Sequence, residues 1–81
     1  MIFKNKVFII IGSEGQIGKV FKQHILYNGG KVCSVDILRT EKKSNKNEFY
    51  IKTNITNLKN IKKILDKTKK LNKKIDCVIN C

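Results

Sequence analysis

Apolar residues gather in four short runs, and two segments between these runs show helical spacing. The first two runs are rich in β-branched residues, which is typical of strands covered on both faces of a sheet. After the first run, apolar residues return every three or four positions, at Ile17, Val20, Phe21 and Ile25, as they do along a helix. The pattern predicts strands over residues 6–11, 31–37, 49–52 and 75–80 and a first helix over residues 16–28.

A second helix is predicted before the fourth strand. Thr56 is a suitable N-cap, because its hydroxyl can accept a hydrogen bond from a free amide of the first turn. Apolar residues follow at helical spacing, and we expect them to face the core: Leu58, Ile61, Ile64, Leu65 and Leu71. Gly29 and Gly30 are expected to end the first helix. The polar residues 38–48 are expected to form a solvated loop.

Strands that alternate with single helices pair in parallel through right-handed crossovers. We therefore expect an α/β fold over residues 1–81, a Rossmann-like parallel sheet of order 3-2-1-4 with flanking helices. Such a sheet is one half of a doubly wound domain. Its fourth strand would be an apolar edge, and an edge of this kind favours self-association or pairing with another segment.

Charge and cysteines narrow the function classes. The net charge of +12 suggests an anionic partner, but only one of the 18 basic residues is an arginine, and no aromatic residues alternate with the lysines. Specific nucleic-acid binding is therefore not favoured. The cysteines, Cys33, Cys77 and Cys81, lack the spacing of a disulfide or metal site and are expected to be buried, reduced thiols. The longest apolar run is too short for a membrane span, so we expect a cytoplasmic protein without a membrane partner.

Three glycines, Gly12, Gly15 and Gly18, lie between the first strand and the first helix. Gly12 allows a tight exit from the strand, Gly15 leaves room for a phosphate, and Gly18 lets the helix pack close to the sheet. The loop GxxxxGK[ST] of nucleotide triphosphatases is excluded, since Val20 stands where a hydroxyl is needed. The turn is suited to a dinucleotide diphosphate bound at a helix N-terminus. A turn with a purely structural role is the alternative.

Asp36 follows Gly18 by 18 residues, at the end of the second predicted strand. This is near the offset at which an acid accepts hydrogen bonds from the adenosine ribose. A carboxylate here would repel a 2′-phosphate, so NAD is favoured over NADP, although Arg39 could pair with such a phosphate. An acid that merely ends a strand is the alternative interpretation.

These residues together resemble the short-chain dehydrogenase/reductase family over nearly the whole chain. The stretch IIIGSEGQIGKVF resembles the glycine motif of the family, and VDI resembles its NAD-selecting strand end. KTNIT resembles the Asp-Val-Thr segment that holds the adenine ring, with Asn54 in place of the aspartate. IDCVINC resembles the fourth strand that leads into Asn-Asn-Ala-Gly, with Asn80 as the first asparagine and Cys81 in place of the second.

The resemblance implies an NAD site that contains Gly12, Ser13, Gly15, Gln16, Ile17, Gly18, Asp36, Asn54, Ile55 and Asn80. It implies the NAD-binding N-terminal segment of an oxidoreductase, which in its full-length form transfers hydride between nicotinamide and a carbonyl or alcohol substrate. Whether this chain is an enzyme stays open, because the catalytic serine and Tyr-x-x-x-Lys pair of the family lack counterparts here. Tyr27 and Lys31 have the spacing, but two glycines separate them. A non-catalytic nucleotide-binding or interaction module is the alternative, and a basic nucleic-acid-binding domain is less favoured.

Overall fold

The computed structural model describes residues 2–37 and 46–81. The predicted loop over residues 38–48 lies largely outside these ranges. Within them the elements are, in chain order, β1 (Val7–Ile11), α1 (Gln16–Tyr27), β2 (Lys31–Asp36), β3 (Glu48–Lys52), α2 (Leu58–Asn72) and β4 (Cys77–Asn80).

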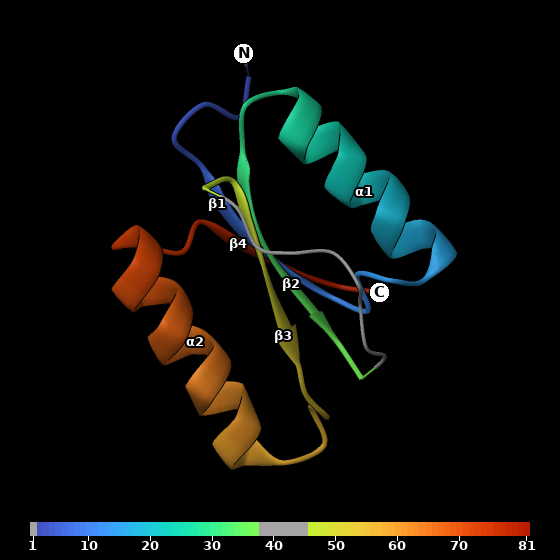
Figure 1. The fold of residues 1–81 in the computed structure, drawn as a ribbon, viewed down its shortest axis with the longest axis vertical. Helices are drawn as coiled ribbons and strands as arrows, with labels where there is room; N and C mark the ends of the chain where they lie inside the picture. Colours follow the sequence, from blue (N-terminus) through green and yellow to red (C-terminus); the bar gives the residue numbers. More distant parts are fainter. Residues whose placement is uncertain (1, 38–45) are drawn as a thin grey trace.

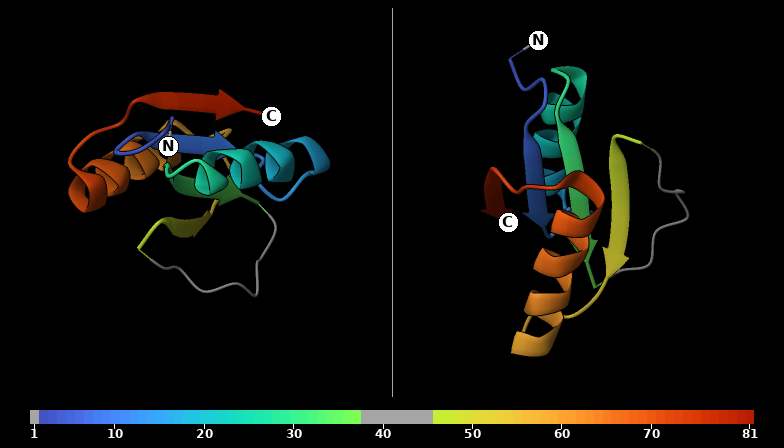
Figure 2. Two further views of the ribbon diagram at one scale, coloured as in Figure 1. Left: turned by 90° about the horizontal axis from the view of Figure 1, so that it is seen from above. Right: turned by 90° about the vertical axis from the view of Figure 1, so that its left-hand side faces the viewer.

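The strands form a parallel sheet of order β3-β2-β1-β4, as predicted. Helix α1 lies on one face of this sheet and α2 on the other (Figures 1 and 2). β1 is therefore covered on both faces, and its successive side chains pack into two separate cores. Ile9 packs with Ile64 of α2, whereas Ile10 packs with Ile25 of α1. This explains why the first apolar run is continuous rather than alternating.

Glycine ends α1 as expected. Gly29 has a φ of 86°, a left-handed conformation that glycine adopts without steric cost. The amide of Gly30 then donates to the carbonyl of Ile25 at 2.9 Å, and the chain turns directly into β2.

The predictions for α2 need two corrections. Its N-cap is Asn57 rather than Thr56, since the side-chain oxygen of Asn57 accepts a hydrogen bond from the Lys59 amide at 2.8 Å. The buried stripe is also narrower than predicted and consists of Ile64 and Thr68. All three leucines expected to face the core are exposed, by 82%, 37% and 55%: Leu58, Leu65 and Leu71.

A hydrogen bond explains why a threonine can occupy the buried stripe of α2. The Thr68 hydroxyl donates to the carbonyl of Ile64 at 2.7 Å, which satisfies its polar atom away from water. Ile61 is half-buried beside this stripe. The leucines lie on the flanks and ends of the helix, where the sheet does not reach them.

Two of the three cysteines differ from the expectation that all are buried. Cys33 is buried in the sheet, and burial raises its pKa to about 11. Cys77 and Cys81 are exposed, because they lie on and just after the edge strand β4. In the described part of the chain, neither helix has the length and apolarity needed to cross a membrane. Among the same residues, no three His, Cys, Asp or Glu side chains gather as metal ligands.

Candidate dinucleotide-binding site

The glycine turn joins the end of β1 to the start of α1. Gly12 has a φ of 82°, which favours glycine, and its amide donates to the Val35 carbonyl at 2.8 Å. Gly15 is the N-cap of α1, and its amide donates to the Gly12 carbonyl at 3.1 Å. A Cβ at Gly18 would lie only 2.2 Å from the Gly12 oxygen. Gly18 therefore brings the helix into direct backbone contact with the strand exit.

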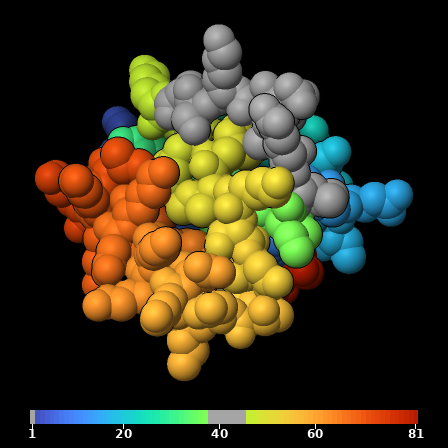
Figure 3. Space-filling view, turned by 60° about the horizontal axis from the view of Figure 1, so that its bottom comes forward, coloured from blue at the N-terminus to red at the C-terminus, as the bar shows by residue number. Residues whose placement is uncertain are grey.

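Two adjoining cavities lie at the edge of the sheet where the strands end. Figure 3 looks toward this edge, with the end of β2 in light green between the yellow segment after β3 and the blue segment leading into α1. The larger cavity, of about 580 Å³, is lined by Gly12, Gly15, Gln16, Ile17, Gly18, Asp36, Ile37 and Cys81. The smaller, of about 240 Å³, is lined by Ile11, Gly12, Val35, Asp36, Ile37, Thr53, Asn54, Ile55, Asn80 and Cys81.

The shared lining residues make the two cavities one groove across the sheet edge. Gly12, Asp36, Ile37 and Cys81 line both of them. All residues predicted to bind the cofactor line this groove except Ser13. Ser13 is fully buried, and its hydroxyl donates to the Glu14 carboxylate at 3.4 Å. Its side chain is thus part of the protein interior beneath the turn.

Asp36 lies at the centre of the groove. One of its carboxylate oxygens accepts a hydrogen bond from the Glu14 amide at 3.0 Å, which ties the end of β2 to the glycine turn. The main-chain carbonyl of Asp36 accepts a hydrogen bond from the Thr53 amide at 3.0 Å, which ties Asp36 to the segment after β3. The structure therefore holds an acid between the parts of the groove suited to a diphosphate and to an adenosine.

Asn54 also makes hydrogen bonds that stabilise the fold. Its side-chain oxygen accepts a hydrogen bond from the Thr56 amide at 3.0 Å, and its carbonyl accepts from the Asn60 side chain at 2.9 Å. These bonds shape the turn that leads into α2. An amide oxygen has two lone pairs, so the same atom can also accept a hydrogen bond from a ligand.

The end of β4 forms the floor of the groove. The Cys81 amide donates to the Ile11 carbonyl at 2.9 Å, which extends the pairing of β4 with β1. A Cβ at Gly12 would lie 2.7 Å from the Cys81 carbonyl oxygen. Gly12 is therefore required both by its left-handed backbone and by this close approach of two main chains.

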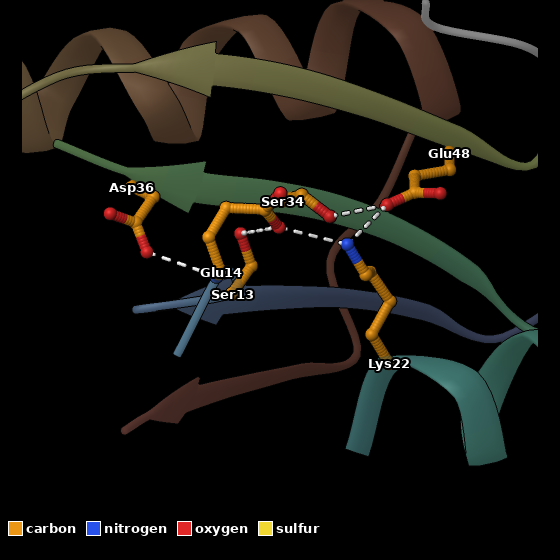
Figure 4. A network of polar contacts seen from close by, with 6 residues as sticks. All are labelled: Ser13, Glu14, Lys22, Ser34, Asp36 and Glu48. Atoms are coloured by element: carbon orange, nitrogen blue, oxygen red, sulfur yellow. Dashed lines mark hydrogen bonds and ion pairs between the residues drawn. The ribbon is translucent and has the colours of Figure 1, made fainter. Parts of the chain in front are cut away.

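A buried ion cluster behind the turn was not predicted from the sequence. The Lys22 ammonium lies 2.9 Å from the Glu14 carboxylate and 3.1 Å from that of Glu48. The Ser34 hydroxyl donates to the same oxygen of Glu48 at 2.8 Å, and the ammonium lies 5.1 Å from the centre of the Tyr50 ring. Figure 4 shows the Lys22 side chain rising from α1 so that its nitrogen lies between the two carboxylates.

The pKa values within the cluster favour its charged form. Burial alone would lower the pKa of Lys22, but its hydrogen bonds to Glu14 and Glu48 outweigh burial and raise it. Burial alone would raise the pKa of Glu14, but the hydrogen bond and charge of Lys22 outweigh that effect and lower it. For Tyr50, burial and the neighbouring Glu48 raise the pKa to about 12.

The cluster exists because α1 does not bury its most apolar face. The helix buries Gly18, Lys22 and Ile25. The other apolar residues of its predicted pattern are exposed, by 66%, 66% and 44%: Ile17, Val20 and Phe21. Glu48, which the sequence placed at the end of a solvated loop, is instead the buried first residue of β3. Its burial is possible because Lys22 and Ser34 neutralise and hydrogen-bond its carboxylate.

The strand order and the flanking helices define a Rossmann-like α/β domain, and comparisons with known structures make the class more specific. No family model and no curated protein matches the chain. A short-chain dehydrogenase from Leptospira borgpetersenii, solved with bound NAD+, is 31% identical with a TM-score of 0.83, over 98% of this chain and 32% of that chain.

Two further structures are similar. An apo SCOR enzyme from Clostridium thermocellum is 27% identical with a TM-score of 0.83, over 91% of this chain and 32% of that chain. A short-chain dehydrogenase/reductase, glucose/ribitol dehydrogenase, from Brucella melitensis has a TM-score of 0.86 over 94% of this chain and 35% of that chain. Its identity of 18% shows the fold alone. The chain thus spans about a third of these structures, and the resemblance to short-chain dehydrogenases/reductases is confirmed.

Proposed function

We propose that this chain binds NAD in the groove at the sheet edge, as the N-terminal, dinucleotide-binding part of a short-chain dehydrogenase/reductase-type oxidoreductase. The observation that carries the proposal is the free N-terminus of α1. Within the described residues, no side chain caps this helix and its first turn holds no acid, and the residues of that turn, Gln16, Ile17 and Gly18, line the larger cavity. Such a helix end attracts a diphosphate.

The lining residues support a division of the groove into two subsites. Among residues 2–37 and 46–81, a Cβ at Gly15 would meet nothing closer than the Gly12 oxygen at 3.4 Å, so these residues leave space above the turn. Gln16, Ile17 and Gly18 would receive the diphosphate there. Asp36 would accept hydrogen bonds from the adenosine ribose, and Asn54 and Ile55 would contact the adenine in the smaller cavity. NAD supplies the hydride-accepting nicotinamide when it is bound.

The carboxylate of Asp36 supports NAD over NADP. A 2′-phosphate in its place would bring two negative groups together, which costs binding energy in a partly buried site. Catalysis belongs to a full-length form in this proposal, because the sequence has no counterpart of the serine and Tyr-x-x-x-Lys pair. We expect the 81-residue chain to bind NAD and to show no alcohol oxidation.

Calorimetric titration of the chain with NAD, NADP and adenosine tests the proposal. We expect NAD to bind more tightly than NADP, and Asp36→Ala to weaken NAD binding by about tenfold or more through lost charge-assisted hydrogen bonds. The matched control is Asp66→Ala, which removes an exposed acid of α2 and should leave NAD binding unchanged. A folded wild-type chain that binds neither NAD nor adenosine would overturn the proposal and favour a pure interaction module.

A further inference from the structure

Glu14 creates an electrostatic conflict at the proposed diphosphate subsite. It lies in the turn between Gly12 and Gly15, two of the three glycines that line the larger cavity. A carboxylate that turned toward this cavity would repel a diphosphate and compete for the amides at the start of α1. The inference below rests on the proposed function, because the conflict exists only if an anion binds there.

The Glu14 side chain avoids this repulsion because it lies behind the turn, away from the cavity. Glu14 lines neither cavity, and its carboxylate makes a 2.9 Å ion pair with Lys22. Lys22 is 3% exposed and lies between α1 and the sheet, so it binds the carboxylate from the side opposite the groove. A buried ion pair is screened little by solvent, which makes this restraint stronger than a surface pair would be.

The position of Lys22 is itself fixed by a second anchor. Its ammonium lies 3.1 Å from Glu48 of β3, whose carboxylate also accepts the Ser34 hydroxyl of β2. The lysine cannot follow Glu14 into the groove without breaking its buried ion pair with Glu48, which is costly. The pKa of Lys22 is raised by these contacts, so the restraint carries a full positive charge at neutral pH.

The proposed ribose subsite is held by a different bond of the same residue. The Glu14 amide donates to the Asp36 carboxylate at 3.0 Å, so one residue is held by its side chain to Lys22 and by its backbone to Asp36. The Asp36 carboxylate is thus held by the main chain of Glu14, and the Lys22 ammonium by its side chain (Figure 4).

We propose that Lys22 is the positioning residue of the diphosphate subsite: it holds the Glu14 carboxylate behind the glycine turn and cancels its charge. Lys22 does not contact the ligand in this scheme. It acts through Glu14, and its effect is confined to ligands that carry the diphosphate. An uncharged adenosine, which has no phosphate, is insensitive to it.

Calorimetric titrations of four variants with NAD and with adenosine test this proposal. Lys22→Met should weaken NAD binding by about tenfold, since it frees a carboxylate beside a diphosphate, and should leave adenosine affinity within about twofold. Adding Glu14→Gln to Lys22→Met should restore NAD affinity to within about threefold of wild type. Lys62→Met is the matched control, because it removes an exposed lysine of α2, on the other face of the sheet from α1. It should change NAD affinity by less than about threefold.

Several results would overturn the proposal. The first is a Lys22→Met chain that keeps wild-type NAD affinity, and the second is one that loses adenosine and NAD alike. The others are a double variant without recovery and a Lys62→Met loss of NAD affinity as large as that of Lys22→Met. If Lys22→Met does not fold, Glu14→Gln decides. Its NAD affinity should stay within about twofold of wild type, and about tenfold tighter binding would show that Lys22 does not cancel the charge. If the wild-type chain binds adenosine and NAD but Lys22 has no effect, this inference alone fails; no binding of either ligand overturns the proposed function as well.

Discussion

A methyl group added at Gly18 has no room in this fold. The Cβ of Gly18→Ala would lie 2.2 Å from the Gly12 carbonyl oxygen, 2.9 Å from the Ser13 Cα and 3.0 Å from the Gly12 carbonyl carbon. All three are backbone atoms of the turn, so no side chain can rotate away to make space. Helix α1 must instead move off the strand exit, or the turn must deform.

The expected loss of stability follows from two opposing effects. Alanine is favoured over glycine inside a helix by about 1 kcal/mol. Overpacking typically costs about 1–3 kcal/mol, and contacts this short against backbone place Gly18→Ala at or above the upper end. The net result is a loss of about 2 kcal/mol in the free energy of unfolding. For a domain of this size that corresponds to a fall in Tm of about 8–16 °C.

Gly15→Ala is the matched control for this prediction. Of the residues that the structure describes, its Cβ would meet only the Gly12 oxygen, at 3.4 Å, and Gly15 has a φ of −76°, which alanine adopts readily. We expect a change within about 1 kcal/mol, because alanine is a poorer N-cap but reduces the entropy of the unfolded chain. Thermal unfolding followed by far-UV circular dichroism measures both variants. A Gly18→Ala chain as stable as wild type, or as Gly15→Ala, would refute the packing argument.

Three further predictions concern Glu14 and the three cysteines. The pKa of Glu14 is lower in the folded chain than its ordinary value of 4.5. The pair of Glu14 with Lys22 therefore stabilises the fold above pH 4.5, and this stabilisation is lost as the pH falls through the pKa of Glu14 in the folded chain. Urea unfolding should accordingly show Glu14→Gln to be less stable than wild type by about 1–2 kcal/mol at pH 7, with the difference vanishing at strongly acidic pH; a difference independent of pH contradicts this. A thiol reagent should modify Cys77 and Cys81 in the native chain and Cys33 only after unfolding, because Cys33 is buried and its pKa is raised to about 11; rapid native labelling of all three would count against the structure. Bound NAD should slow the modification of Cys81, which lines the groove, but not that of Cys77, as peptide mass spectrometry can measure; equal protection of both or neither would argue against NAD in this groove.

Much of the fold was predictable because apolar periodicity and glycine positions are local signals. The continuous first run identified a doubly covered strand, and the alternation of strands and helices gave the order 3-2-1-4 that the sheet shows. Gly12 and Gly18 were assigned to a tight exit and a close helix contact, and the structure places both in such positions. These features depend on backbone geometry, which glycine reveals directly in a sequence.

The orientation of α1 was harder to predict, because it is set by one backbone contact rather than by hydrophobicity. Once Gly18 is pressed against the turn, the residues one and two turns further along the same face, Lys22 and Ile25, must also face the sheet. The spacing of Gly18, Lys22 and Ile25 is visible in the sequence, but the pattern through Val20 and Phe21 is more apolar and was therefore predicted to be the buried face. The partner of Lys22 on β3, Glu48, is distant in sequence, and no local pattern links the two.

Cys81 and Gly12 meet through their main chains although 69 positions separate them in the sequence. β1 is made before β4, with which it pairs, so the floor of the groove cannot form while the ribosome is still adding the residues between them. A nascent chain would present β1 with one long edge unpaired until Cys81 has emerged. Contacts of such long range also slow folding, so we expect closure of β4 onto β1 to be the late step that creates the binding groove.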